Sequence, residues 1–302
     1  MWMSPSSVLR HGLKLVNLDP DVRVSSRERN EKMFEQHFGA CAFVLSTQWY
    51  DLVHDKIPTK KLTDKEKSMR GFNLFLIAHF WLFTKPKNAT EGSSRFGRCE
   101  KLLQGAKFWL WIERISLLKH KVIKWPKRFD DPRSEVFIMT VDGIDLKRNR
   151  TITQHATLPV DTKYYSKKHN QDGLKYELGF AIHTNKLVWM NGPFKAAEHD
   201  ITVFRNRGLM AKLKQGKRVI ADRGYKGEAL WLSVPNAHDS KALAKFKSRA
   251  RCRHEAFNGL LKKYGCLAET FTHGDEKHKL AFEAIAVTCQ YKLNCGTLLF
   301  DV

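Results

Sequence analysis

Apolar residues recur at helical spacing through the first third of the chain. Between residues 30 and 118 they return every three or four positions, as at Phe72, Leu76 and Phe83. This period is typical of amphipathic α-helices, and Pro86 is a natural end for one of them. We therefore expect residues 29–132 to form an all-α domain.

The segments on either side of these helices have a different character. Residues 1–28 are mixed in polarity and end in a charged run, so we predict a flexible N-terminal arm there. Residues 119–133 form a basic connector that contains two prolines. We place the domain boundary at its end, between residues 132 and 133.

From residue 133 onward the pattern changes to short runs of β-branched and apolar residues. These runs predict strands at Val136–Val141, Leu174–His183, Leu187–Asn191 and Val219–Ala221. Helical spacing predicts helices over residues 201–214, 241–264 and 279–293. Three antiparallel strands followed by crossover helices predict an α/β domain over residues 133–302, with a mixed sheet covered by helices.

The helical domain also contains a candidate helix-turn-helix. A short helix over residues 91–96, a break at Gly97 and a longer helix over residues 100–118 match that pattern. In such a motif the second helix enters the DNA major groove. The alternative is that Trp109 and Trp111 of the longer helix pack against the neighbouring domain.

Charge narrows the choice of partner. The 302 residues include 53 Lys or Arg and 31 Asp or Glu, which gives a formal net charge of +22. A charge of this size favours polyanions, of which nucleic acid is the commonest. An anionic membrane surface and a merely basic protein are the alternatives. The longest apolar run, Phe72–Phe83, is too short to span a bilayer, which needs about 20 residues.

Cysteine usage indicates a reducing compartment. The six cysteines contain no C-x-x-C pair, and the chain does not open with a signal-peptide pattern. A disulfide framework is therefore not expected, and we predict a cytosolic or nuclear protein.

Two acidic residues stand alone in basic surroundings. Asp222 is the single acid among eight Lys or Arg between residues 205 and 226, and Glu255 is the single acid among eight between residues 241 and 263. Asp142 lies on the first predicted strand and Asp222 at the end of the fourth. A right-handed crossover would place those strands side by side, and the helix of Glu255 would lean over the same edge.

Three carboxylates at one place predict a divalent-metal site. Neighbouring acids repel one another unless a cation lies between them. Carboxylate oxygens without nearby Cys or paired His suit Mg²⁺ or Mn²⁺. Two such ions about 3.5–4 Å apart can activate a water or a 3′-hydroxyl and stabilise the leaving oxygen of a phosphodiester.

Each carboxylate also has a plainer interpretation. Asp222 can be a surface counter-charge, and Glu255 an exposed helix residue paired with Arg251 four positions earlier. Asp200 competes with Asp222 for the second position, but an N-cap role explains it. Asp145 lies on the opposite strand face from Asp142 by alternation. We interpret the isolated histidines His199 and His254 as structural.

Five short motifs occur in an order that resembles one family. They are Val141-Asp142-Gly143, Trp189 to Phe194, His199 to Arg205, Ala221 to Tyr225, and Arg253-His254-Glu255. This order is similar to that of the DDE superfamily endonucleases of PIF/Harbinger-type transposable elements. The resemblance runs from about residue 137 to the C-terminus, with a weaker helical resemblance before it.

The resemblance implies an RNase H-like catalytic domain that cleaves and transfers DNA strands. By motif match its Asp-Asp-Glu triad is Asp142, Asp222 and Glu255, which would bind two Mg²⁺ or Mn²⁺ ions. It also implies a helix-turn-helix upstream, a Myb-like accessory protein, a homo-oligomer assembled on DNA, and a nuclear location. Two alternatives remain open: a domesticated DNA-binding regulatory protein that keeps the fold without cleavage, and a nuclease acting on RNA.

Overall fold

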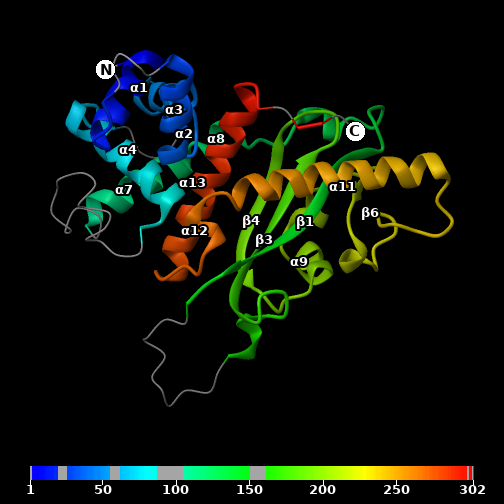
Figure 1. The fold of residues 1–302 in the computed structure, drawn as a ribbon. Coiled ribbons are helices and arrows are strands. Elements are labelled where there is room, and N and C mark those ends of the chain that lie inside the picture. The colour runs from blue at the N-terminus through cyan, green and yellow to red at the C-terminus, as the bar shows by residue number, and fades with distance from the viewer. Residues whose placement is uncertain are drawn as a thin grey trace. The chain divides into compact units, whose positions relative to one another are not determined.

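A computed structural model describes residues 2–19, 26–54, 62–86, 105–149, 161–297, 299–300 and 302. Within them the chain forms two compact units, and Figure 1 labels their helices and strands where there is room. The first unit comprises residues 1–122, 262–269 and 276–296, and the second comprises residues 123–261, 270–275 and 297–302.

The first unit is helical. Its helices are α1 Pro5–Leu15, α2 Arg27–Phe38, α3 Ala42–His54, α4 Met69–Thr84, α7 Ala106–Leu117, α8 Lys119–Val122, α12 Gly265–Ala268 and α13 Asp275–Asn294. Aromatic side chains form much of its core: the ring centroids of Trp49 and Trp111 lie 5.6 Å apart, and those of Trp81 and Trp109 lie 5.3 Å apart. Thus both tryptophans of α7 pack inside this unit. Helix α4 holds the longest apolar run, and no helix in the described part of the chain is long and apolar enough to cross a bilayer.

The N-terminus contributes to this core. Ser4 caps α1 by accepting a hydrogen bond from the Ser7 amide, and Val8, Leu9 and Leu13 are buried. The flexible arm predicted over residues 1–28 is therefore wrong for residues 5–15. The reason is physical: the apolar positions of α1 share one helix face, and that face packs against the rest of the unit.

Because α1 is part of the core, truncating one of its buried side chains should destabilise the fold. Leu13 is fully buried, so Leu13→Ala should lower the free energy of unfolding by about 3 kcal/mol, measured by urea denaturation. The exposed Ser6 gives the control, because Ser6→Ala removes no buried contact. Equal stability of the two variants would mean that α1 does not pack as described.

Helix α13 also differs from the predicted domain organisation. We expected it in the C-terminal domain, yet its residues from Glu276 onward belong to the first unit. There Gln48 Nε2 donates to Thr288 Oγ1 over 3.2 Å, and the Tyr291 hydroxyl donates to Asp51. Its apolar character is that of a core helix, as predicted, but the core is that of the helical unit.

The structure describes only part of the proposed helix-turn-helix. The short helix over residues 91–96 and the break at Gly97 lie outside the described residues. The longer helix is present as α7, which begins at Ala106 and not at residue 100.

The second unit is built on a six-stranded mixed sheet. Its strands are β1 Phe137–Lys147, β2 Tyr165–Ser166, β3 Gln171–Ala181, β4 Leu187–Lys195, β5 Arg218–Ile220 and β6 Leu232–Ser233. Their order is β2-β3-β1-β5-β6, with β4 also paired to β3. The pairs that β3 makes with β1, β2 and β4 are antiparallel, whereas β5 is parallel to β1 and to β6. This is the mixed sheet that the sequence predicts, with two short strands, β2 and β6, in addition to the four predicted ones.

Helices cover both faces of this sheet. They are α9 Asp200–Asn206, α10 Leu209–Lys212 and α11 Lys241–Leu261, with short 3-10 turns η1 Lys127–Asp130, η2 Thr162–Tyr164 and η3 Arg223–Tyr225. Val141 packs in one core cluster with Phe204 of α9, whereas Ile220 packs with Ala250 of α11 in another. Figure 1 shows α11 lying over the strands. A single helix was predicted over residues 201–214, but Gly208 has a φ of 102° and separates α9 from α10.

Candidate active site

Asp142 lies on β1, and Asp222 lies just past the end of β5, the parallel strand next to β1. Thr140 of β1 is paired with Ile220, the last residue of β5. Asp142 lies two residues further along β1, and Asp222 lies two residues past the end of β5, where it caps η3. Since side chains alternate along a strand, residues two apart share a face. The side-by-side arrangement predicted for these two strands is confirmed.

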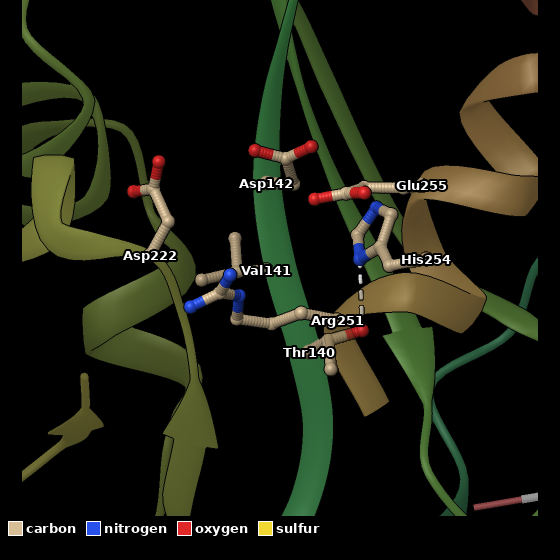
Figure 2. A pocket seen from close by; sticks show the side chains of 7 residues that line it. All are labelled: Thr140, Val141, Asp142, Asp222, Arg251, His254 and Glu255. Atoms are coloured by element: carbon tan, nitrogen blue, oxygen red, sulfur yellow. Dashed lines mark hydrogen bonds between the residues drawn. The ribbon is translucent and has the colours of Figure 1, made fainter. Parts of the chain in front are cut away.

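Helix α11 adds the third carboxylate. One pocket of the second unit is lined by Thr140, Val141, Asp142, Asp222, Arg251, His254 and Glu255, and Figure 2 shows them from close by. Arg251 and Glu255 are four residues apart and therefore lie on one side of the helix. The structure thus brings all three predicted site residues to the wall of a single pocket.

The carboxyl group of Asp142 has a strongly raised pKa. Burial first, and then the charges of Asp222 and Asp200, raise its pKa from 3.8 to about 7. Asn258 of α11 donates from Nδ2 to Asp142 Oδ2 over 2.8 Å and so orients the carboxyl group. Asp142 is therefore costly to ionise unless a cation offsets the neighbouring negative charges.

The other two carboxylates are more open to solvent. Asp222 is exposed, and its Oδ1 accepts a hydrogen bond from the Gly224 amide over 2.8 Å, which caps η3. Glu255 is also exposed. The alternative in which Glu255 pairs with Arg251 does not hold, because these two described side chains form no ion pair within 4.0 Å.

The donor set suits a hard divalent cation. It consists of carboxylate oxygens. Burial, and after it the neighbouring negative charges, raise the pKa of Asp142, and a bound cation would oppose this shift. Among the described residues, however, no three His, Cys, Asp or Glu side chains are close enough to hold one ion together. The three carboxylates repel one another. In addition, Asn258 holds Asp142 and the Gly224 amide holds Asp222 through separate hydrogen bonds, which favours carboxyl groups that stay apart.

Asp200 lies next to this site without lining the pocket. The N-cap interpretation is wrong: His199 is the N-cap residue of α9, and Asp200 is the first helical residue. Its Oδ1 accepts a hydrogen bond from Lys175 Nζ over 2.6 Å. A Cβ on Gly143 would lie 2.7 Å from Asp200 Oδ1, and one on Gly224 would lie 2.9 Å from its Oδ2. Asp200 thus fills the space between the residue after Asp142 and the turn after Asp222, where both glycines leave room for it.

His254 lines the pocket, although the sequence interpretation treats it as structural. It is buried, and its Nδ1 shares a hydrogen bond of 2.8 Å with the Thr140 hydroxyl. Burial first, and then the charge of Arg253, lower its pKa to about 3, so the ring is neutral. Its Nε2 is buried and has no hydrogen-bond partner among the described residues.

Three further residues belong to this site. The sequence interpretation did not name Asn258, and it named Arg251 only as an ion-pair partner of Glu255 and His254 only as a structural histidine. A signal exists for Arg251 and Asn258, which lie four positions before and three positions after Glu255 on a predicted helix and therefore on the same side of it. Helical spacing gives no such signal for His254, which directly precedes Glu255. Asp145, by contrast, lies outside the pocket, and its Oδ2 accepts a hydrogen bond from Ser166 over 3.0 Å.

Comparison with known families agrees with this geometry. The family described as DDE superfamily endonuclease matches residues 141–290, a stretch that contains Asp142, Asp222 and Glu255. No match was found among curated proteins or among solved structures. The mixed sheet flanked by helices, after a helical N-terminal region, is consistent with the RNase H-like fold predicted from the sequence. Residues 141–290 therefore form a DDE superfamily endonuclease domain.

Proposed function

We propose that this protein is a transposase of the PIF/Harbinger type, which cleaves and transfers DNA strands at Asp142, Asp222 and Glu255. The observation that carries the proposal is the pocket lined by these three carboxylates. The match to DDE superfamily endonucleases supports phosphodiester chemistry, and the order of five sequence motifs supports the Harbinger subtype.

In this proposal the three carboxylates hold Mg²⁺ or Mn²⁺, with two ions in the site. Bound ions would supply Lewis-acid activation of the attacking hydroxyl and stabilisation of the leaving oxygen. The chain's own contribution is positioning. Asn258 orients the carboxyl group of Asp142 through its 2.8 Å hydrogen bond, and the Gly224 amide fixes one oxygen of Asp222.

The remaining functional assignments follow from DNA as substrate. A net charge of +22 favours binding to the DNA backbone, at element termini and at the target site. We further propose a nuclear location, assembly as a homo-oligomer on DNA, and a Myb-like accessory protein as partner. The helical unit is the candidate for additional DNA contacts.

Loss of Asp222 tests the proposed chemistry. The substrate is a supercoiled plasmid carrying the terminal repeats that flank the gene, incubated with Mg²⁺ or Mn²⁺. Asp222→Asn should reduce the rate of strand cleavage at least ~1,000-fold, because several kcal/mol of metal-dependent stabilisation would be lost. Asp130, an exposed acid of the same unit, gives the matched control Asp130→Asn.

Two results would contradict the proposal in different ways. Cleavage by Asp222→Asn at the wild-type rate would remove the triad assignment. Salt-dependent DNA binding by the wild-type protein, with no metal-dependent cleavage of DNA, would instead identify a DNA-binding regulatory protein that keeps the fold.

A further inference from the structure

Arg251 is a cation in a pocket of acids, yet it forms no ion pair with any residue in the described part of the chain. It lines the pocket together with Asp142, Asp222 and Glu255. Figure 2 shows its side chain extending from α11 across β1 toward the side of the pocket where Asp222 lies. No hydrogen bond or ion pair joins it to another described residue. An arginine beside three carboxylates would ordinarily be expected to pair with one of them.

The neighbouring arginines of α11 have other roles. Arg253 is buried and donates from its guanidinium to the carbonyl oxygens of Ala181 and Ile182. Arg249 places its guanidinium over the ring of Phe300, 6.0 Å from the centroid. Of these three arginines, Arg251 is the one whose guanidinium faces the pocket.

We infer that Arg251 binds the phosphate group of the DNA that enters this pocket. The inference rests on the proposed function and names the residue that would contact the substrate's own charge. Cations held by the carboxylates would neutralise the charges of Asp142, Asp222 and Glu255. The guanidinium of Arg251 would then be able to bind an incoming anion. A planar guanidinium donates two parallel hydrogen bonds to the non-bridging oxygens of a phosphodiester, so Arg251 both positions the phosphate and offsets charge that develops on it.

Three variants separate this role from a structural one. Arg251→Gln removes the charge, Arg251→Lys keeps it but loses the two-bond geometry, and Lys245→Gln removes an equal charge from an exposed position on the same helix. Nicking of supercoiled plasmid with Mn²⁺ should fall about 100-fold in Arg251→Gln, less in Arg251→Lys, and remain near the wild-type rate in Lys245→Gln.

Mn²⁺ binding without DNA provides a second readout, by calorimetry. Removing a positive charge beside three carboxylates cannot weaken their attraction for a cation, so Arg251→Gln should bind Mn²⁺ at least as tightly as the wild-type protein. Weaker Mn²⁺ binding would mean that Arg251 only holds the pocket together, and it would overturn the inference. Nicking by Arg251→Gln at the rate of Lys245→Gln would overturn it as well.

DNA affinity tests the contact even if the proposed cleavage fails. With Ca²⁺ in place of Mn²⁺, binding of a fluorescent DNA duplex is measured against salt concentration. Loss of one phosphate contact should reduce the slope of log affinity against log salt by about 0.9. A wild-type protein that never nicks DNA contradicts the proposed function, whereas an unchanged slope in Arg251→Gln contradicts the role of Arg251.

Discussion

Replacing Asp142 with Asn should abolish metal-dependent DNA cleavage and, in the absence of metal, make the protein more stable at pH 8. The carboxyl group has a pKa near 7 in the folded protein and 3.8 as its ordinary value. Its contribution to stability is therefore complete below about pH 3.8 and is lost as the pH rises to about 7. Asn removes this loss, which amounts to up to about 4 kcal/mol, while it can still accept the hydrogen bond from Asn258.

Thermal unfolding with and without Mg²⁺ measures both effects. The metal-free variant should melt above the wild-type protein at pH 8, and the two should converge near pH 4. Saturating Mg²⁺ should raise the melting temperature of the wild-type protein alone, because ligand binding stabilises only a chain that retains the site. Asp145→Asn, a change on the same strand outside the pocket, should keep the Mg²⁺ response. A metal-free Asp142→Asn protein that is less stable at pH 8 would contradict the electrostatic account of this site.

Removing Lys175 should destabilise the second unit strongly. Its buried ammonium donates to Asp200 Oδ1 and to the Glu198 carbonyl oxygen, over 2.6 and 2.7 Å. Asp200 already contributes to the raised pKa values of Asp142 and Glu177. Lys175→Met would leave the Asp200 carboxylate without its counter-charge in this acidic surrounding. We expect a loss of about 3 kcal/mol in the free energy of unfolding.

A double-mutant cycle identifies the cause of this loss. Adding Asp200→Asn to Lys175→Met should recover part of the stability, because the charge nearest to the lost ammonium is then gone. Asp145, whose Oδ1 lies 3.9 Å from Lys175 Nζ, remains without this counter-charge. Lys195→Met removes an ion pair with Asp161 that is much more exposed and should change little. Independent, additive effects of the two substitutions in urea denaturation would show that the Lys175–Asp200 pair does not carry this stability.

The position of Asp200 also explains why glycines stand near Asp142 and Asp222. Neither Gly143 nor Gly224 has a left-handed backbone conformation, so no turn requires glycine there. The space where their side chains would be is occupied by Asp200. A carboxylate held between β1 and the turn after β5 thus ties together the two strands that carry Asp142 and Asp222.

Local sequence patterns predict much of the secondary structure of the second unit. Alternating and β-branched runs predict the strands, and the handedness of crossovers predicts that β1 and β5 are neighbours. Those two rules are enough to bring Asp142 and Asp222 together, since each lies two residues past the Thr140–Ile220 pair. Helical periodicity then places Glu255 and Arg251 on one side of α11.

Contacts between distant segments account for what local patterns do not predict. Asp200 has the sequence context of an N-cap, but its partner Lys175 lies 25 residues away on β3, and only folding brings the two together. Likewise, the apolar pattern of α13 predicts burial without saying which core it joins, because any apolar surface gains free energy by leaving water. Periodicity along the chain therefore predicts which residues form each element and which face is buried, whereas hydrogen-bond partners, burial of charge and the unit to which a helix belongs depend on contacts made in three dimensions.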